Sequence, residues 1–230
     1  MTKRVSLKVE ALDYYSTVAI ISVYNTLNNA LNMRVGILGS ACDPPHKAHI
    51  KMAEVAQKEL KLDRVIIIPT KVPPHKDLPL VPQGMRLKMA KLAVGGRKNW
   101  IVSDMELKRK GKSYTRDTIH DLKKFYPKDK IFWIVGSDAI VSMPWKWKGG
   151  WGILDLCKFV VFPRLGYSLK KVPKNILKKV IVLKPITRNL EEISSTKIRD
   201  MFKKKKSSLK YIDRKVYGFI KKYKLYMTQL

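Results

Sequence analysis

Apolar residues follow two alternating patterns along this chain. Uninterrupted apolar runs, typical of strands buried on both faces, predict strands at residues 34–38, 64–68, 100–102, 131–135, 159–162 and 180–183. The segments between and after them predict helices at residues 50–60, 84–94, 114–125, 196–204 and 209–223, with Ser113 as the N-cap of the third. This alternation predicts an α/β fold, a doubly wound parallel sheet with helices on both faces and a helical C-terminal end.

Residues 1–32 do not continue the alternation. They contain the polar pair Asn28 and Asn29 and only a weak helical pattern, and Met33 directly precedes the first strand. We therefore divide the chain into an N-terminal extension at residues 1–32, whose status the sequence leaves open, and one domain at residues 33–230. The chain has 230 residues, of which 45% are hydrophobic, enough for one sizeable core.

The chain carries 48 Lys and Arg residues against 18 Asp and Glu residues, a net charge of +30. Such an excess attracts polyanions, which include nucleotides, nucleic acids and acidic membranes. Almost all of the excess is lysine, however, and a lysine-rich proteome would give every protein this bias. We therefore expect no dedicated nucleic-acid surface from charge alone.

The cysteines and the apolar segments indicate in which cellular compartment the protein is expected. Cys42 and Cys157 form neither a disulfide framework nor a metal-binding spacing. No apolar run approaches the roughly 20 residues that span a bilayer, and the N-terminal segment lacks a signal-peptide pattern. We therefore expect a cytoplasmic protein with no membrane partner, whose oligomeric state the sequence does not determine.

The loop after the first strand carries the first chemical motif, residues 39–49. Gly39 and Ser40 directly follow the strand, where a glycine lets the backbone turn sharply and approach a ligand. His46 and His49 lie three residues apart at the start of a helix, whose free N–H groups favour anions. Both imidazoles can donate to phosphate oxygens. The alternative is zinc ligation, but only His75 and His120 remain as further histidines.

A second motif, residues 193–199, opens a basic helix near the C-terminus. Ser195, Thr196 and Arg199 lie in its first turns, where hydroxyl groups, backbone N–H groups and a guanidinium all favour phosphate. Alone, this motif also describes an ordinary capped helix. Together, the two motifs predict a site that holds one polyphosphate from both sides.

The chain resembles the bacterial nicotinate-nucleotide adenylyltransferase family of the HxGH-type nucleotidyltransferase superfamily. The resemblance extends over residues 33–226 and follows the family's order. It rests on Asp43-Pro44-Pro45-His46-x-x-His49, Ile68-Pro69-Thr70, Pro73-Pro74-His75-Lys76, Arg86-Leu87-x-Met89, Ser113-Tyr114-Thr115-x-Asp117-Thr118, Ile134-Val135-Gly136-Ser137-Asp138, Trp147, Phe162-Pro163-Arg164-x-Gly166 and Ile193-Ser194-Ser195-Thr196-x-Ile198-Arg199. It implies a Rossmann-like nucleotidyltransferase domain at residues 33–230.

The resemblance also implies a reaction, in which ATP and nicotinate mononucleotide give nicotinate adenine dinucleotide and pyrophosphate. It assigns catalytic roles to His46, His49 and Arg199. The implied ATP-binding residues are Gly39, Ser40, Ala41, Gly136, Asp138, Ser195 and Thr196. The implied mononucleotide-binding residues are Lys76, Thr115, Trp147 and Arg164. Mg²⁺ is expected to accompany ATP, carried by phosphates and water without a protein metal site.

Three positions of the first motif depart from the family pattern, and the Gly-Gly-Trp-Gly stretch at residues 149–152 departs from the charged helix start that the family has there. Ala41 and Cys42 replace a hydroxyl residue and Phe, and Ala48 replaces Gly between the two histidines. We expect the methyl group of Ala48 to crowd the phosphates and to slow catalysis. Because both histidines are present, we still expect an active enzyme.

Two alternative functions stay open. A related adenylyltransferase would use nicotinamide mononucleotide or phosphopantetheine. A different class of function, a non-catalytic nucleic-acid-binding module, would use the twelve basic residues against two acidic ones at positions 197–224, with Tyr211, Tyr217 and Tyr223 stacking on bases. A solvated helical face with tyrosines in the core explains the same residues, and we favour it.

Overall fold

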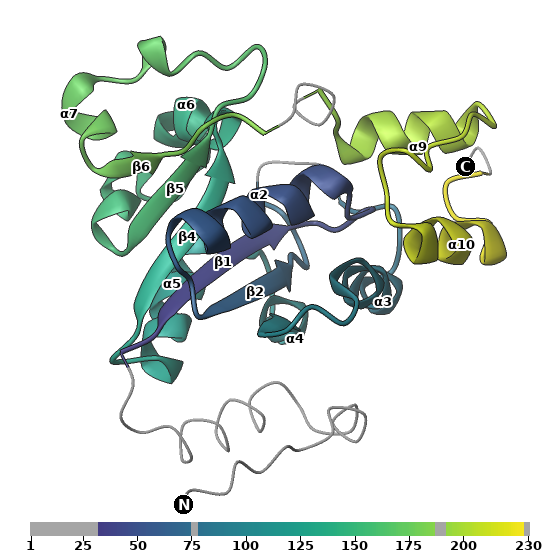
Figure 1. The fold of residues 1–230 in the computed structure, drawn as a ribbon, viewed down its shortest axis with the longest axis horizontal. Helices are drawn as coiled ribbons and strands as arrows, with labels where there is room; N and C mark the ends of the chain where they lie inside the picture. The colour runs from purple at the N-terminus through teal and green to yellow at the C-terminus, as the bar shows by residue number, and fades with distance from the viewer. Residues whose placement is uncertain (1–31, 75–77, 187–191, 228–230) are drawn as a thin grey trace, which may run out of the picture.

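The computed structural model describes residues 32–74, 78–186 and 192–227. Its sheet has six strands, β1 (Arg34–Ser40), β2 (Arg64–Pro69), β3 (Trp100–Val102), β4 (Lys130–Gly136), β5 (Lys158–Phe162) and β6 (Val180–Val182). All neighbouring strands pair in parallel, in the order β3-β2-β1-β4-β5-β6 (Figure 1). The sheet winds outwards in both directions from β1 and β4, so the predicted doubly wound α/β fold is confirmed.

The strands are apolar throughout because helices cover both faces of the sheet. Val35 and Ile37 of β1 belong to one apolar cluster, whereas Leu38 belongs to the other. Successive side chains of a strand point to opposite faces, so each strand contributes to both clusters. The core therefore consists of two apolar layers, one on each side of the sheet.

Two groups of helices build these layers. One face packs against α2 (Lys47–Glu59), α3 (Gln83–Val94), α9 (Ser195–Lys203) and α10 (Arg214–Lys222). The other packs against α5 (Thr115–Phe125), α6 (Ser137–Lys146), the 3-10 helix η2 (Gly150–Asp155) and α7 (Lys174–Leu177). The short α4 (Met105–Lys108) and η3 (Leu169–Lys171) lie in connections. In Figure 1, α10 lies next to α3, and α9 lies above α10, both past the arrowheads of β1 and β2.

The helix starts differ from those predicted. α2 begins at Lys47, before the predicted start at residue 50, so that both histidines of the first motif lie at its N-terminus. Ser113 is not the N-cap of α5, since Tyr114 holds that position. α10 begins only at Arg214, because the carboxylate of Asp213 caps it by accepting the N–H of Lys215 at 2.7 Å.

Helix α6 was not predicted, and it contains a proline. Pro144 has no N–H for the carbonyl of Ile140, four residues earlier. The indole N–H of Trp151 donates to that carbonyl instead, at 3.2 Å. Ile140 and Met143 are buried on its inner face. Tertiary packing and a distant donor thus stabilise a helix that its own sequence disfavours.

The start of β1 is held by two acidic side chains. The N–H of Met33 donates to Asp129 Oδ1 at 3.0 Å, and the N–H of Arg34 donates to Asp63 Oδ2 at 2.7 Å. The extension proposed at residues 1–32 lies outside the described residues, apart from Asn32. Within the described ranges, no helix combines the length and the apolar character that a membrane crossing requires.

Candidate active site

The first motif forms the loop between β1 and α2, at the C-terminal edge of the sheet. Gly39 lies against Trp133 of β4, because a Cβ at this glycine would lie 3.1 Å from the indole ring. Ser40 turns the chain, since its Oγ accepts the N–H of Cys42 at 3.3 Å. Ala41 follows, half-buried. The motif therefore lies at the strand ends, where open parallel sheets bind ligands.

His46 and His49 meet at the N-terminus of α2. Their rings stack with centroids 3.7 Å apart. His49 Nδ1 accepts the N–H of His46 at 3.4 Å, so a neutral His49 carries its proton on Nε2, which lies 3.2 Å from Ser40 Oγ. His46 is buried, whereas His49 is half-buried and therefore more accessible. An imidazole donor thus lies between the helix N-terminus and the loop after β1.

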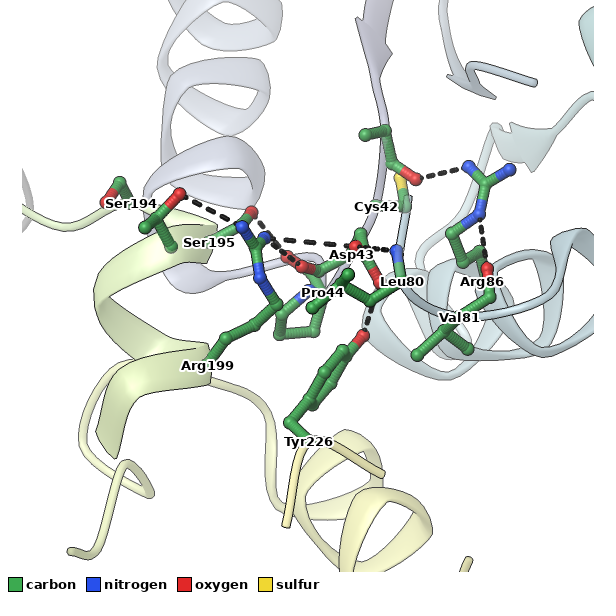
Figure 2. A network of polar contacts seen from close by, with 12 residues as sticks. Cys42, Asp43, Pro44, Leu80, Val81, Arg86, Ser194, Ser195, Arg199 and Tyr226 are labelled. Atoms are coloured by element: carbon green, nitrogen blue, oxygen red, sulfur yellow. Dashed lines mark hydrogen bonds and ion pairs between the residues drawn. The ribbon is translucent and has the colours of Figure 1, made fainter. Parts of the chain in front are cut away.

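Asp43 is buried within this loop and forms hydrogen bonds to separate parts of the chain. Sequence reasoning assigned it no role. Its carboxylate accepts the hydroxyl of Tyr226 at 2.7 Å and the N–H of Leu80 at 2.9 Å. Arg199 Nη1 lies 3.8 Å from Asp43 Oδ2. Figure 2 shows these groups converging on the carboxylate from separate segments. A carboxylate within the first motif therefore binds protein groups, which a local motif cannot reveal.

The second motif packs directly on the first. Ser194 caps α9, and its side chain accepts the N–H of Lys197 at 3.2 Å. The hydroxyl of Ser195 donates to the carbonyl of Pro44 at 2.9 Å. Arg199 donates from Nη1 to the carbonyl of Asp43 at 2.8 Å. The structure therefore brings together the two motifs that the sequence placed at opposite ends of the domain (Figure 2).

Arg86 of α3 forms a hydrogen bond to the same loop. Its guanidinium, in a residue only 2% exposed, donates to four backbone carbonyls, those of Ala41, Thr70, Lys71 and Val81. Burial lowers the pKa of Arg86, while the nearby Asp43 raises it. One buried cation thus ties the loop after β1 to the loop after β2. The sequence contained this arginine within a family-like motif but did not indicate its role.

Gly136, Asp138 and Arg164 form a second cluster, at the ends of β4 and β5. A Cβ at Gly136 would lie 2.3 Å from Asp138 Oδ1, so glycine permits the close approach of this carboxylate. Arg164 Nη1 pairs with Asp138 Oδ2 at 3.2 Å, and its Nη2 donates to the carbonyl of Ile193 at 3.0 Å. Arg164 thereby connects Asp138, one of the predicted ATP-binding residues, to the segment that leads into α9.

Two other predicted mononucleotide residues, Thr115 and Trp147, lie on the α5 and α6 side of the sheet. Thr115 is the first residue of α5. Trp147 follows α6 and is half-buried, with its ring edge-on to Phe159 at a centroid distance of 6.4 Å. Trp145, two residues earlier in the chain, is 81% exposed. Lys76 lies outside the described residues.

A buried carboxyl beneath the loop at residues 113–115 also escaped sequence reasoning. Glu106 is 3% exposed, and its Oε1 accepts the hydroxyl of Thr118 at 2.6 Å. Burial raises the pKa of Glu106, while Thr118 and Arg109 partly offset this shift. Arg109 also donates to the hydroxyl of Thr118 at 2.8 Å. This network joins α4 to the start of α5, where Thr115 lies.

Comparisons with known proteins agree with this geometry. A family model described as cytidylyltransferase-like matches residues 37–201. Proteins named "Probable nicotinate-nucleotide adenylyltransferase" from Clostridium tetani and Thermus thermophilus are 37% and 36% identical over 197 and 194 residues. These matches cover 83% and 84% of this chain and 97% and 100% of the relatives. The chain belongs to the nicotinate-nucleotide adenylyltransferase branch of the cytidylyltransferase-like family.

A solved structure supports the fold of this adenylyltransferase family member. The chain is similar to Plasmodium falciparum nicotinic acid mononucleotide adenylyltransferase, solved in complexes with APC and with NaAD. The TM-score is 0.71 at 20% sequence identity, and the match covers 84% of this chain and 97% of that chain. At this identity the likeness shows the shared fold.

The departures from the adenylyltransferase pattern lie in well-packed surroundings. Ala48 is 4% exposed and belongs to the apolar layer formed by α2 and α3, so its methyl group packs in the core. Cys42 is 1% exposed, and burial raises the pKa of its thiol to about 12. At neutral pH the thiol is therefore protonated and serves as a packing group.

The donor set of the site fits a magnesium ion that is carried by ATP. Among residues 32–74, 78–186 and 192–227, no group of three His, Cys, Asp or Glu side chains forms a metal-binding cluster. Asp43 and Asp138 each accept hydrogen bonds from protein donors. Mg²⁺ commonly binds phosphate oxygens and water with few protein ligands, so this arrangement accommodates a phosphate-bound ion.

Proposed function

We propose that this protein joins ATP to nicotinate mononucleotide and releases pyrophosphate and nicotinate adenine dinucleotide. The observation that carries the proposal is the direct contact between the two phosphate-seeking motifs, through Ser195 to Pro44 and Arg199 to Asp43. This contact supports the proposal because it brings a histidine pair and an arginine together at the edge of a parallel sheet where ligands usually bind. The curated relatives carry the matching name.

The reaction needs positioning and charge stabilisation more than a covalent nucleophile. A phosphate oxygen of the mononucleotide attacks the α-phosphorus of ATP in line, and the bond from that phosphorus to the bridging oxygen breaks as pyrophosphate leaves. His49 donates from Nε2 to a phosphate oxygen, exchanging its contact with Ser40 Oγ. His46, stacked on His49, fixes that ring and contacts the same phosphates.

The start of α9 binds the leaving pyrophosphate. Arg199 keeps guanidinium N–H groups beyond those that bond Asp43 and Thr196, and these pair with phosphate oxygens. The hydroxyl of Thr196 accepts from Arg199 at 3.1 Å, so its own proton is available to a phosphate. Ser195 donates its proton to Pro44, and therefore acts by fixing α9 on the first loop.

The two nucleosides bind on either side of the phosphates. We assign the ribose of ATP to Asp138, with Gly136 allowing close approach, and the backbone around Gly39, Ser40 and Ala41 to its phosphates. Arg164 and Lys76 bind the mononucleotide phosphate, Thr115 binds the nicotinate carboxylate, and Trp147 stacks on the pyridine ring. Magnesium, when bound to the triphosphate, supplies neutralising charge. The catalytic domain is residues 33–230, in the cytoplasm, with residues 1–32 as an extension.

The proposal is tested by incubating the purified protein with ATP and Mg²⁺ and either nicotinate or nicotinamide mononucleotide. We expect dinucleotide and pyrophosphate, with the acid mononucleotide preferred. Chromatography of the products and a pyrophosphate assay measure both. If neither mononucleotide gives a dinucleotide, the proposal is refuted. If nicotinamide mononucleotide is preferred, the assignment of nicotinate mononucleotide as the substrate is wrong.

A histidine variant tests the mechanism. His49→Ala removes the imidazole donor from the helix N-terminus, and we expect at least about a 100-fold loss of kcat, the usual scale for one oxyanion-type donor. His120→Ala is the matched control, because His120 is exposed on α5. Circular dichroism checks the fold of both variants. Equal turnover by His49→Ala and wild type would remove His49 from the mechanism.

A further inference from the structure

The C-terminal segment reaches back to the phosphate site through one tyrosine. Tyr226 lies 183 residues after Asp43, and its hydroxyl donates to Asp43 Oδ1 at 2.7 Å (Figure 2). The residue is 7% exposed, and its ring packs near Phe202 of α9, with centroids 6.3 Å apart. Burial and the neighbouring carboxylate both raise the pKa of Tyr226. The hydroxyl therefore stays protonated and acts as a donor.

This hydroxyl satisfies a carboxylate that would otherwise compete for Arg199. Asp43 receives Tyr226 on one oxygen and the N–H of Leu80 on the other. Arg199 Nη1 bonds the backbone carbonyl of Asp43 at 2.8 Å and lies farther, at 3.8 Å, from the carboxylate. Without the tyrosine donor, the buried carboxylate would lack a partner on Oδ1, and a guanidinium is the strongest donor within reach.

The same C-terminal segment also contacts the start of the histidine helix. The N–H of Lys47, the residue directly after His46, donates to the carbonyl of Tyr211 at 2.8 Å. Lys47 Nζ lies 3.4 Å from the carbonyl of Leu209. The cytidylyltransferase-like family model matches only as far as residue 201, so these contacts come from a segment that lies beyond the matched range. Two independent contacts thus link this segment to the first motif.

We infer that Tyr226 is a positioning residue for the phosphate site: by satisfying Asp43, it keeps the guanidinium of Arg199 directed at the polyphosphate. This inference rests on the proposed function and deepens it. Tyr226 touches no substrate and acts through Asp43 and Arg199. Removing its hydroxyl would draw Arg199 onto the carboxylate and would weaken binding of the triphosphate.

The test compares Tyr226→Phe with Tyr223→Phe, which removes the hydroxyl of a tyrosine that is 47% exposed on the same segment. Calorimetry measures binding of a non-hydrolysable ATP analogue, independently of turnover. We expect about tenfold weaker binding for Tyr226→Phe, the scale of one hydrogen bond to a charged group, and no change for Tyr223→Phe. Unchanged affinity in Tyr226→Phe would overturn the inference. Thermal unfolding verifies that both variants are folded.

A double-mutant cycle separates positioning from general loosening of the structure. In an Arg199→Ala background, Tyr226→Phe should change analogue affinity by less than about twofold, because the two residues act in series. A tenfold effect that persists in this background would overturn the inference. Kinetics supply a second readout, since the KM for the mononucleotide should stay unchanged as kcat falls. If wild type binds the analogue but forms no dinucleotide, the proposed function fails while the positioning inference is still judged by the binding data.

Discussion

Replacing Arg86 with Met tests whether one buried cation holds together the two loops of the phosphate site. Met retains much of the apolar stem but removes the guanidinium. Four carbonyls then lose their donor, those of Ala41, Thr70, Lys71 and Val81. Two of the distances, 2.7 Å to Ala41 and 3.0 Å to Val81, are those of well-formed hydrogen bonds. The carboxylate of Asp43 also loses a nearby positive charge.

The cost of this change follows from the burial of the group. A buried carbonyl without a partner costs about 1–3 kcal/mol, and water entering the loops would satisfy part of the set. Breaking a buried charged network by removing one partner typically costs about 3–5 kcal/mol, and we expect Arg86→Met to fall in this range. Domains of this kind have roughly 5–15 kcal/mol of total stability, so the variant should fold with a sharply lowered midpoint.

Urea unfolding followed by circular dichroism measures the effect. Arg97→Met is the control for burial, because Arg97 also donates to two backbone carbonyls, those of Ala93 and Val94, but it pairs with Glu54 at the surface and both of these side chains are more than one third exposed. Such a surface pair contributes about 0–1 kcal/mol. An Arg86→Met variant within about 1 kcal/mol of wild type would refute the reasoning, because four carbonyls, one in a buried and three in partly buried hydrogen bonds, should not lose their donor at so small a cost.

Two further predictions concern the other clusters. Gly136→Ala places a methyl group 2.3 Å from Asp138 Oδ1 and 2.6 Å from Arg164 Cδ. We therefore expect Asp138 and Arg164 to separate and the KM for ATP to rise at least about fivefold. Gly152→Ala is the control, because its added methyl group meets no atom within 4 Å. The raised pKa of Glu106 means that the folded protein binds its proton more tightly than the unfolded chain does. The stability contributed by this protonation is full below a pH of about 4.5 and is lost as the pH rises through the folded-state pKa. Glu106→Gln should therefore gain unfolding free energy relative to wild type between pH 4.5 and pH 7, and a difference that stays constant over this range would contradict the shift.

The strands could be predicted because their signal is local. Each is a short apolar run, and burial on both faces of a parallel sheet requires such a run whatever the rest of the chain does. Helix starts were less predictable, because they depend on individual capping groups. Ser113 has the chemistry of an N-cap, yet its N–H donates to Val72 and the helix begins later, after Tyr114.

The sequence identified the candidate site residues but not their hydrogen-bond partners. Motif order identified His46, His49, Ser195 and Arg199 as phosphate-seeking groups. Their hydrogen-bond partners could not be named in this way, because a hydroxyl or guanidinium binds backbone carbonyls as readily as phosphates. Ser195 donates to Pro44, a contact with no signature in either motif.

The sequence by itself determined the fold class, the two phosphate-seeking motifs and the family, since each rests on short local patterns and on their order along the chain. Only the tertiary structure decided which charges meet. Asp43 appears in the sequence as one acid within a histidine motif, but its carboxylate accepts hydrogen bonds from Leu80 and Tyr226, which lie 37 and 183 residues away, and its backbone carbonyl accepts one from Arg199, 156 residues away. A buried carboxylate requires several donors at once, and folding alone brings such distant donors together.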